Sequence, residues 1–207
     1  MLQIVITAFF LGLIFNAAPG AVFAETIRRS MRGGFREALY LQFGSLTGDA
    51  FWAVLGLMGI GVLLQSPALQ APIGIAGAAY LGYLAWDSWF AAKATTDTQP
   101  GNGGSMPAAR AGVILSMTNP QNIAYWAALG SSFGAIGIAD PQPLDFALFF
   151  AGFMISSILW CFVCAGVVTR VFGNAGDKWK FWTYRLCAAA FFYLACGTLY
   201  DVVKMLF

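Results

Sequence analysis

Long apolar stretches separated by short polar segments run along the whole chain. An apolar stretch of about 20 residues is enough for an α-helix to cross the ~30 Å hydrocarbon core of a bilayer. The spans that we predict are Leu2–Ala24, Ala38–Leu64, Pro72–Ala91, Ala111–Ile138, Leu144–Thr169 and Trp182–Phe207. The pattern therefore predicts an all-α integral membrane protein with six transmembrane helices.

The composition agrees with this prediction and excludes several classes of protein. Of the 207 residues, 59% are hydrophobic and only 10% are charged, whereas soluble domains carry about 25% charged residues. A net charge of +2 offers no surface for neutralising phosphates. The absence of histidine excludes a Ser-His-Asp triad and zinc sites that need imidazole. We therefore expect a membrane protein with no nucleic-acid partner, no metal and no cofactor.

The basic residues predict the orientation. Ten of the eleven Lys and Arg residues lie at the connections that follow the first, third and fifth spans, and only Lys204 lies elsewhere. The ten are Arg28, Arg29, Arg32, Arg36, Lys93, Arg110, Arg170, Lys178, Lys180 and Arg185. Because basic loops stay in the cytoplasm, these odd-numbered loops are predicted to be cytoplasmic and both termini to lie outside.

A cleaved signal peptide is the alternative for the first span, because residues 21–24 read Ala-Val-Phe-Ala before Glu25. However, no basic residue precedes the apolar stretch. Cleavage would also place the four-arginine segment on the translocated side, where positive charge is disfavoured. We therefore keep residues 1–24 as a transmembrane span.

The two halves of the chain, 1–92 and 111–207, resemble each other across a polar linker at 93–110 that we predict to be a flexible cytoplasmic loop. The matching positions are Gly12 with Gly112, Pro19 with Pro120, Gly44 with Gly152, Gly48 with Ser156, Trp52 with Trp160, and Asp87 with Asp201. A duplicated unit of three spans must insert with inverted topology, which is typical of secondary transporters. We therefore expect two inverted three-helix repeats.

Proline interrupts the first and fourth spans, at Pro19-Gly20 and Asn119-Pro120. A proline inside the membrane removes a backbone hydrogen bond, and Asn-Pro is a favourable start for a new helix. Helix starts expose N–H groups that suit a carboxylate. We predict that these breaks, together with Asn16 in the same motif, bind substrate; the alternative is a pair of kinks that only shape the bundle.

Asp49 lies near the middle of the second span and has no charged neighbour in the sequence. A carboxylate at that depth costs a few kcal/mol, so its default interpretation is a functional group facing a cavity. We predict that it binds the substrate's ammonium group and carries the coupled proton; a structural hydrogen bond between helices is the alternative. Asp87 and Asp201, at matching ends of the third and sixth spans, are gate candidates.

Cys161 and Cys164 have the spacing of a thiol redox pair but lie inside the fifth span without a basic neighbour. Buried, unreactive side chains are the favoured interpretation. An intramembrane thiol oxidoreductase and a non-transporting scaffold stay as alternatives to a transporter.

The chain resembles the LysE/RhtB family of bacterial amino-acid exporters over nearly its whole length. The resemblance rests on Asn16-Ala-Ala-Pro19-Gly20, Gly33-Gly34-Phe35-Arg36-Glu37-Ala38, Gly44-Ser-Leu-Thr-Gly48-Asp49, residues 77–86 (GAAYLGYLAW) and Thr118-Asn119-Pro120. Two positions depart from the family pattern: Ala21 stands where a second proline is typical, and Gln121 where lysine is frequent.

The resemblance implies a small protein of the bacterial inner membrane that exports an amino acid in exchange for protons. Its expected partners are then an amino-acid substrate, protons and the lipid bilayer. A homo-oligomer stays open, because the glycine spacings can pack helices within or between subunits.

Overall fold

The described part of the chain is entirely helical. The computed structural model describes residues 1–17, 20–57, 67–94, 107–119, 122, 126, 142–173 and 176–206. In these residues it has six helices and no strand: α1 (Leu2–Ala17), α2 (Ala21–Leu57), α3 (Pro67–Ala94), α4 (Ala108–Met117), α6 (Pro143–Phe172) and α7 (Asp177–Leu206). The all-α class predicted from the sequence is confirmed for this part of the chain.

Two of the helices are long and apolar enough to cross a bilayer by themselves. An 18-residue window has a mean hydropathy of 2.2 in Pro143–Phe172 and of 1.7 in Asp177–Lys204. Leu2–Ala17 and Ala21–Gly56 meet the same criteria as a pair bent by 65°. The end of the second predicted span and most of the fourth lie outside the described residues, so the count of six spans stays a prediction.

The first span breaks where the sequence predicts. Helix α1 ends at Ala17, and α2 begins at Ala21, where the amide of Ala24 donates to the carbonyl of Gly20 at 3.0 Å. Pro19 itself lies outside the described residues. The chain therefore changes direction between α1 and α2 inside what the hydropathy pattern marks as a single span.

The segment after this break corrects one expectation, because the four arginines lie on a helix and not in a loop. Helix α2 carries Arg28, Arg29 and Arg32 before a kink at Gly33 and Gly34, and Arg36 after it. Gly34 has φ 67° and ψ −154°, a conformation that only glycine adopts easily. The kink folds the first half of α2 (residues 21–32) back beside its second half (35–57), and Arg28 and Arg29 become buried.

The fourth span also breaks near its prediction. Helix α4 ends at Met117, and the amide of Thr118 still donates to the carbonyl of Ile114 at 2.9 Å. Asn119 follows outside the helix, and Pro120 and Gln121 lie outside the described residues. Both predicted breaks thus coincide with helix ends.

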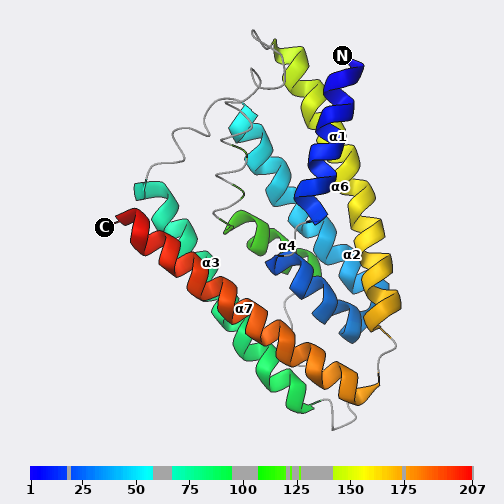
Figure 1. Cartoon of the computed structure of the whole chain (residues 1–207), viewed down its shortest axis with the longest axis vertical. Coiled ribbons are helices and arrows are strands. Elements are labelled where there is room, and N and C mark those ends of the chain that lie inside the picture. Colours follow the sequence, from blue (N-terminus) through cyan, green and yellow to red (C-terminus); the bar gives the residue numbers. More distant parts are fainter. Residues whose placement is uncertain are drawn as a thin grey trace.

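The helices pack against each other in pairs. Helix α3 lies antiparallel to α7, with the C-terminus of the chain beside the start of α3, while α1 and α2 lie against α6, and α4 sits between the two groups (Figure 1). Small residues allow these approaches. A Cβ atom on Gly152 of α6 would lie 2.5 Å from the carbonyl oxygen of Val5, and one on Gly48 of α2 would lie 2.6 Å from the Ser116 side chain.

Two apolar clusters hold the groups together. One joins α1, α2 and α6 around Trp52, Trp126 and Phe153, and the rings of Trp126 and Phe153 lie 4.5 Å apart. The other joins the first half of α2 to α3, α4 and α7, with Leu84 and Phe191 at its centre. Trp52 and Trp126 are therefore core residues.

The close approach of α1 to α6 predicts a stability effect. Gly152→Ala should lower the stability of the protein in detergent by roughly 1–3 kcal/mol, because the new methyl group overlaps the backbone of α1. Gly166→Ala on the same helix is the control, because a Cβ atom there meets nothing within 4 Å. Thermal unfolding of purified protein measures both. Equal midpoints for the two variants would contradict the packing described.

Candidate functional site

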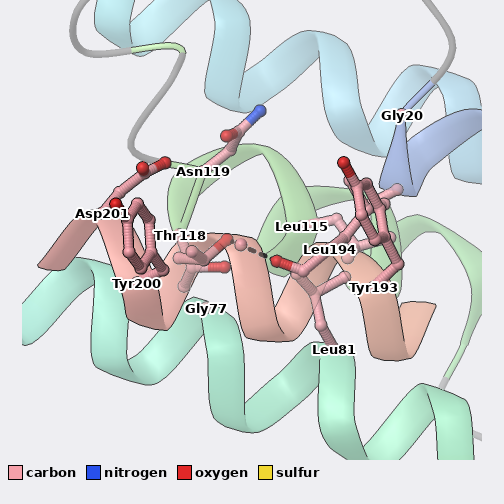
Figure 2. Close-up of a pocket in the computed structure, with 13 residues that line it drawn as sticks. Gly20, Gly77, Leu81, Leu115, Thr118, Asn119, Tyr193, Leu194, Tyr200 and Asp201 are labelled. Atoms are coloured by element: carbon pink, nitrogen blue, oxygen red, sulfur yellow. Dashed lines mark hydrogen bonds between the residues drawn. The ribbon is translucent and has the colours of Figure 1, made fainter. Parts of the chain in front are cut away.

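A cavity of about 430 Å³ lies where the two broken spans meet α3 and α7 (Figure 2). Its walls come from the start of α2, from α3, from the end of α4 and from α7. The lining residues are Gly20, Ala21, Gly77, Leu81, Leu115, Thr118, Asn119, Tyr193, Leu194, Gly197, Thr198, Tyr200 and Asp201. The volume and the mixture of apolar walls with a few polar groups are typical of small-molecule sites.

Residues from both helix breaks line this cavity. Gly20 precedes α2, and Asn119 follows α4. A Cβ atom on Gly20 would meet nothing within 4 Å, so the chain leaves open space at the first break. The first amide groups of α2 have no acceptor within their own helix, which leaves donors at this wall. The structure therefore brings together Gly20 and Asn119, two of the residues that the sequence predicts to bind substrate.

The cavity has a polar end. Tyr200 and Asp201 lie toward Asn119, while Tyr193 lies near Gly20 at the opposite end (Figure 2). Among the lining residues Asp201 is the only one with an ionisable carboxylate, and it is solvent-exposed at the cavity. The end of α4 also carries the partial negative charge of a helix C-terminus. This end of the cavity is thus suited to a cationic group.

Asp49 is buried beside the cavity but is not among its lining residues. Its side chain is 7% exposed, and its Oδ1 accepts hydrogen bonds from the Ser116 hydroxyl at 2.7 Å and from Asn122 Nδ2 at 2.8 Å. Ser116 precedes the break in the fourth span and Asn122 follows it. The carboxylate therefore bonds to both sides of the break, and its partner Ser116 follows Leu115, which lines the cavity.

Ser116 and Asn122 are functional candidates that the sequence analysis did not identify. Both are buried, and Asn122 Nδ2 also lies 3.0 Å from the Ser116 hydroxyl. The signal was present in the sequence as two small polar residues that flank Asn119-Pro120 in an apolar span. Their pairing with Asp49 was not readable, because it depends on the register between α2 and α4.

Asn16 also lies away from the cavity walls. Its Nδ2 donates to the Gly12 carbonyl at 2.6 Å and to the Ser157 hydroxyl at 2.8 Å, which joins the end of α1 to α6. Ser157 stands at the position of the second half that corresponds to Asp49, one residue after Ser156, the counterpart of Gly48. Asn16 thus joins two spans next to the first break, as Asp49 does next to the second.

Asp87, the first gate candidate, belongs to a buried cluster of ion pairs. Glu25 is fully buried and accepts hydrogen bonds from Arg28 at 2.5 and 2.6 Å and from Arg29 at 2.8 Å. Arg28 also pairs with Asp87 on α3. Glu25 thus pairs with both arginines, which follow it by three and four residues on the same helix.

Two further contacts complete the cluster. Arg32 lies 3.4 Å from Asp87, and Arg29 lies 3.3 Å from Glu37 beyond the kink. The cluster therefore ties the first half of α2 to α3 and to its own second half. In this way it fixes the segment that begins at the cavity.

Cys161 and Cys164 are both buried and free, and the Gln42 amide donates to the Cys164 sulfur at 3.3 Å. Their positions one helical turn apart on the inner face of α6 agree with the interpretation as packing residues.

The apolar helices and the helix breaks at the cavity are those of a membrane protein that is helical throughout its described residues. The sequence model of the family described as LysE type translocator matches residues 13–202. The chain belongs to this family, and the resemblance noted from its motifs is confirmed. The family is one of transporters and not of enzymes.

Two curated relatives illustrate the family. A Pseudomonas aeruginosa protein named chemotactic transduction protein ChpE is 43% identical over 199 residues, which cover 94% of this chain and 97% of the relative. A Salmonella typhimurium homoserine/homoserine lactone efflux protein is 32% identical over 124 residues, which cover 58% and 59%. No solved structure matches the chain significantly.

The ion-pair cluster predicts that neutralising its buried acid lowers the stability of the protein more than neutralising its partly exposed acid. Glu25→Gln should destabilise the protein by roughly 3–5 kcal/mol, because it leaves two buried guanidinium groups without their main partner. Glu37→Gln is the matched control and should cost no more than about 1 kcal/mol, because that carboxylate is partly exposed. Thermal unfolding in detergent measures both. A Glu25→Gln protein as stable as Glu37→Gln would show that the cluster is dispensable.

Proposed function

We propose that the protein exports an amino acid or a similar small zwitterion by proton antiport, with the cavity at the two helix breaks as the substrate site. The observation that carries this proposal is that Gly20, Asn119 and Asp201, which are far apart in sequence, line one cavity. Membership in a translocator family and a relative named for homoserine efflux support the chemical class of substrate.

In the proposed complex the substrate's ammonium group pairs with Asp201. The ammonium and carboxylate groups of an α-amino acid lie close together, so the substrate's carboxylate is at the same end of the cavity. There the Tyr200 hydroxyl and the Asn119 amide can donate hydrogen bonds to it. The side chain of the bound amino acid then points toward Gly20 and Tyr193. This arrangement assigns to Asp201 the ammonium-binding role that the sequence suggested for Asp49.

Asp49 is proposed to couple the proton. When its carboxylate is charged, the hydrogen bonds from Ser116 and Asn122 are charge-assisted and hold the two sides of the break together. Protonation weakens them, so the end of α4 that carries Leu115, Thr118 and Asn119 can move. Because these residues line the cavity, the protonation state of Asp49 can change access to the substrate.

Two inverted three-helix repeats, 1–92 and 111–207, are proposed to move against each other. The contacts support this: α1 packs on α6 and α2 on α4, which are equivalent pairs if the two halves exchange places. The bonds of Asn16 to Ser157 and of Ser116 to Asp49 are equivalent in the same way. We propose the bacterial inner membrane as location, with the basic segments that follow the first, third and fifth predicted spans in the cytoplasm and both termini outside.

The role of Asp49 predicts a separation of coupling from binding. Asp49→Asn should abolish efflux driven by a proton gradient, because the amide cannot take up or release the proton. Counterflow of substrate at equal pH should persist, because the residue does not line the cavity. Both are measured in proteoliposomes. Full proton-driven efflux by Asp49→Asn would exclude the residue as the coupling group.

The role of Asp201 predicts a loss of affinity. Asp201→Asn should raise the half-saturating concentration of substrate at least about tenfold, because a charge-assisted bond to the ammonium group is lost. Asp177 is an exposed residue in the first turn of the same helix, and Asp177→Asn should leave the half-saturating concentration unchanged. Counterflow titration of both variants is the measurement, and equal values for the two would remove Asp201 from the site.

A non-transporting role is a second candidate, and one observation favours it. The Pseudomonas aeruginosa relative that matches almost the whole chain is named for chemotactic transduction and not for efflux. A scaffold in a signalling complex predicts no saturable flux of any amino acid by folded protein in proteoliposomes. Saturable flux would exclude a purely structural role.

A further inference from the structure

A second, apolar crevice of about 440 Å³ lies along α7, next to the substrate cavity. The first half of α2 contributes Phe23 and Ile27, the end of α6 contributes Phe172, and α7 contributes Trp182, Leu186 and Ala190. The Thr183 hydroxyl in its wall already donates to the Trp179 carbonyl at 2.9 Å. The crevice therefore offers hydrocarbon walls and little to orient a polar ligand.

The walls of the crevice face outward. The side chains of Trp182 and Leu186 are 63% and 68% exposed in the isolated chain. On a protein that lies in a bilayer, such surfaces contact lipid chains. From Trp182 to Leu194 the α7 wall measures about 18 Å at 1.5 Å per residue, close to the ~15 Å of one leaflet. Its length and chemistry fit one acyl chain.

Basic residues are close neighbours in the sequence of the residues that line one end of the crevice. Lys178 and Lys180 flank Trp179, which lines the crevice, and Arg170 precedes Phe172. Asp177 is the acid of this region, so positive charge prevails in the described residues there. Basic residues at a membrane surface attract anionic headgroups, and tryptophan favours the same interface. The charge at this end therefore complements an anionic headgroup.

The crevice also borders the substrate cavity. Gly20, Tyr193 and Leu194 line both spaces, and open space surrounds the position of a Cβ atom on Gly20. An acyl chain in the crevice would press against the segment of α2 that starts at the first break. Its end would reach the side of the cavity opposite Asp201 (Figure 2).

We propose that this crevice binds one chain of an anionic phospholipid, whose headgroup lies among Lys178, Lys180 and Arg170. The bound lipid supports the first half of α2 against α7. This site is separate from the polar end of the substrate cavity, and its occupancy does not depend on which solute the protein moves.

Lipid retention by the full-length protein tests the proposal. The protein is extracted in detergent, exposed to phosphatidylglycerol or phosphatidylcholine of the same chain length, and analysed by native mass spectrometry. Phosphatidylglycerol should be retained at least about fivefold better. The Lys178→Gln/Lys180→Gln variant should lose this preference, whereas Lys204→Gln at the other end of α7 should keep it. Equal retention of the two lipids by the unmodified protein would overturn the proposal.

A pair of neighbouring alanines tests the position of the chain. Ala190 lines the crevice, while Ala189 is exposed outside it. Ala190→Phe fills the space and should reduce phosphatidylglycerol retention at least fivefold, whereas Ala189→Phe should not. Equal retention by the two variants would show that the lipid binds elsewhere.

A second measurement does not depend on whether Ala190→Phe folds. In vesicles, phosphatidylglycerol with brominated chains should quench tryptophan fluorescence more than brominated phosphatidylcholine at equal mole fraction. The excess should fall in Trp182→Phe, because Trp182 lines the crevice. An unchanged excess in Trp182→Phe would contradict the assignment.

Discussion

A helix that breaks within a bilayer must satisfy its freed polar groups inside the protein, and this constraint organises the whole structure. At the break in the fourth span, the carboxylate of Asp49 bonds to Ser116 before the break and to Asn122 after it. At the first break, Asn16 bonds to Ser157 on a neighbouring span. Each break is therefore held by a side chain that joins two helices. The space that the breaks leave becomes the cavity.

The buried ion pairs around Glu25 also hold the chain in position, on the other side of the first break. Glu25 holds Arg28 and Arg29, and Arg28 pairs with Asp87 on α3. Together with the kink at Gly34, this cluster folds the first half of α2 back into the bundle. Such pairs carry a desolvation cost, so their main effect is to specify one position for this segment. That position places Gly20 at the cavity.

Much of this organisation was readable from the sequence. Apolar stretches predicted the helices, and proline marked the two breaks. The arginine segment was expected to be a loop because it is highly charged. It is a helix, stabilised by burial against α3. The contacts of Asp49 and the contribution of Asp201 to the cavity could not be predicted, since both depend on how α7 and α4 pack on distant helices.

The central claim is that both helix breaks line one substrate cavity, and substrate protection of single cysteines tests it most directly. Gly20→Cys and Asn119→Cys are made in a protein whose four native cysteines are replaced, with Leu199→Cys, exposed on α7 outside the cavity, as the control. The account predicts that the transported amino acid protects positions 20 and 119 from a thiol reagent at the same concentration and leaves position 199 reactive. Protection of only one break, or of neither, would contradict it.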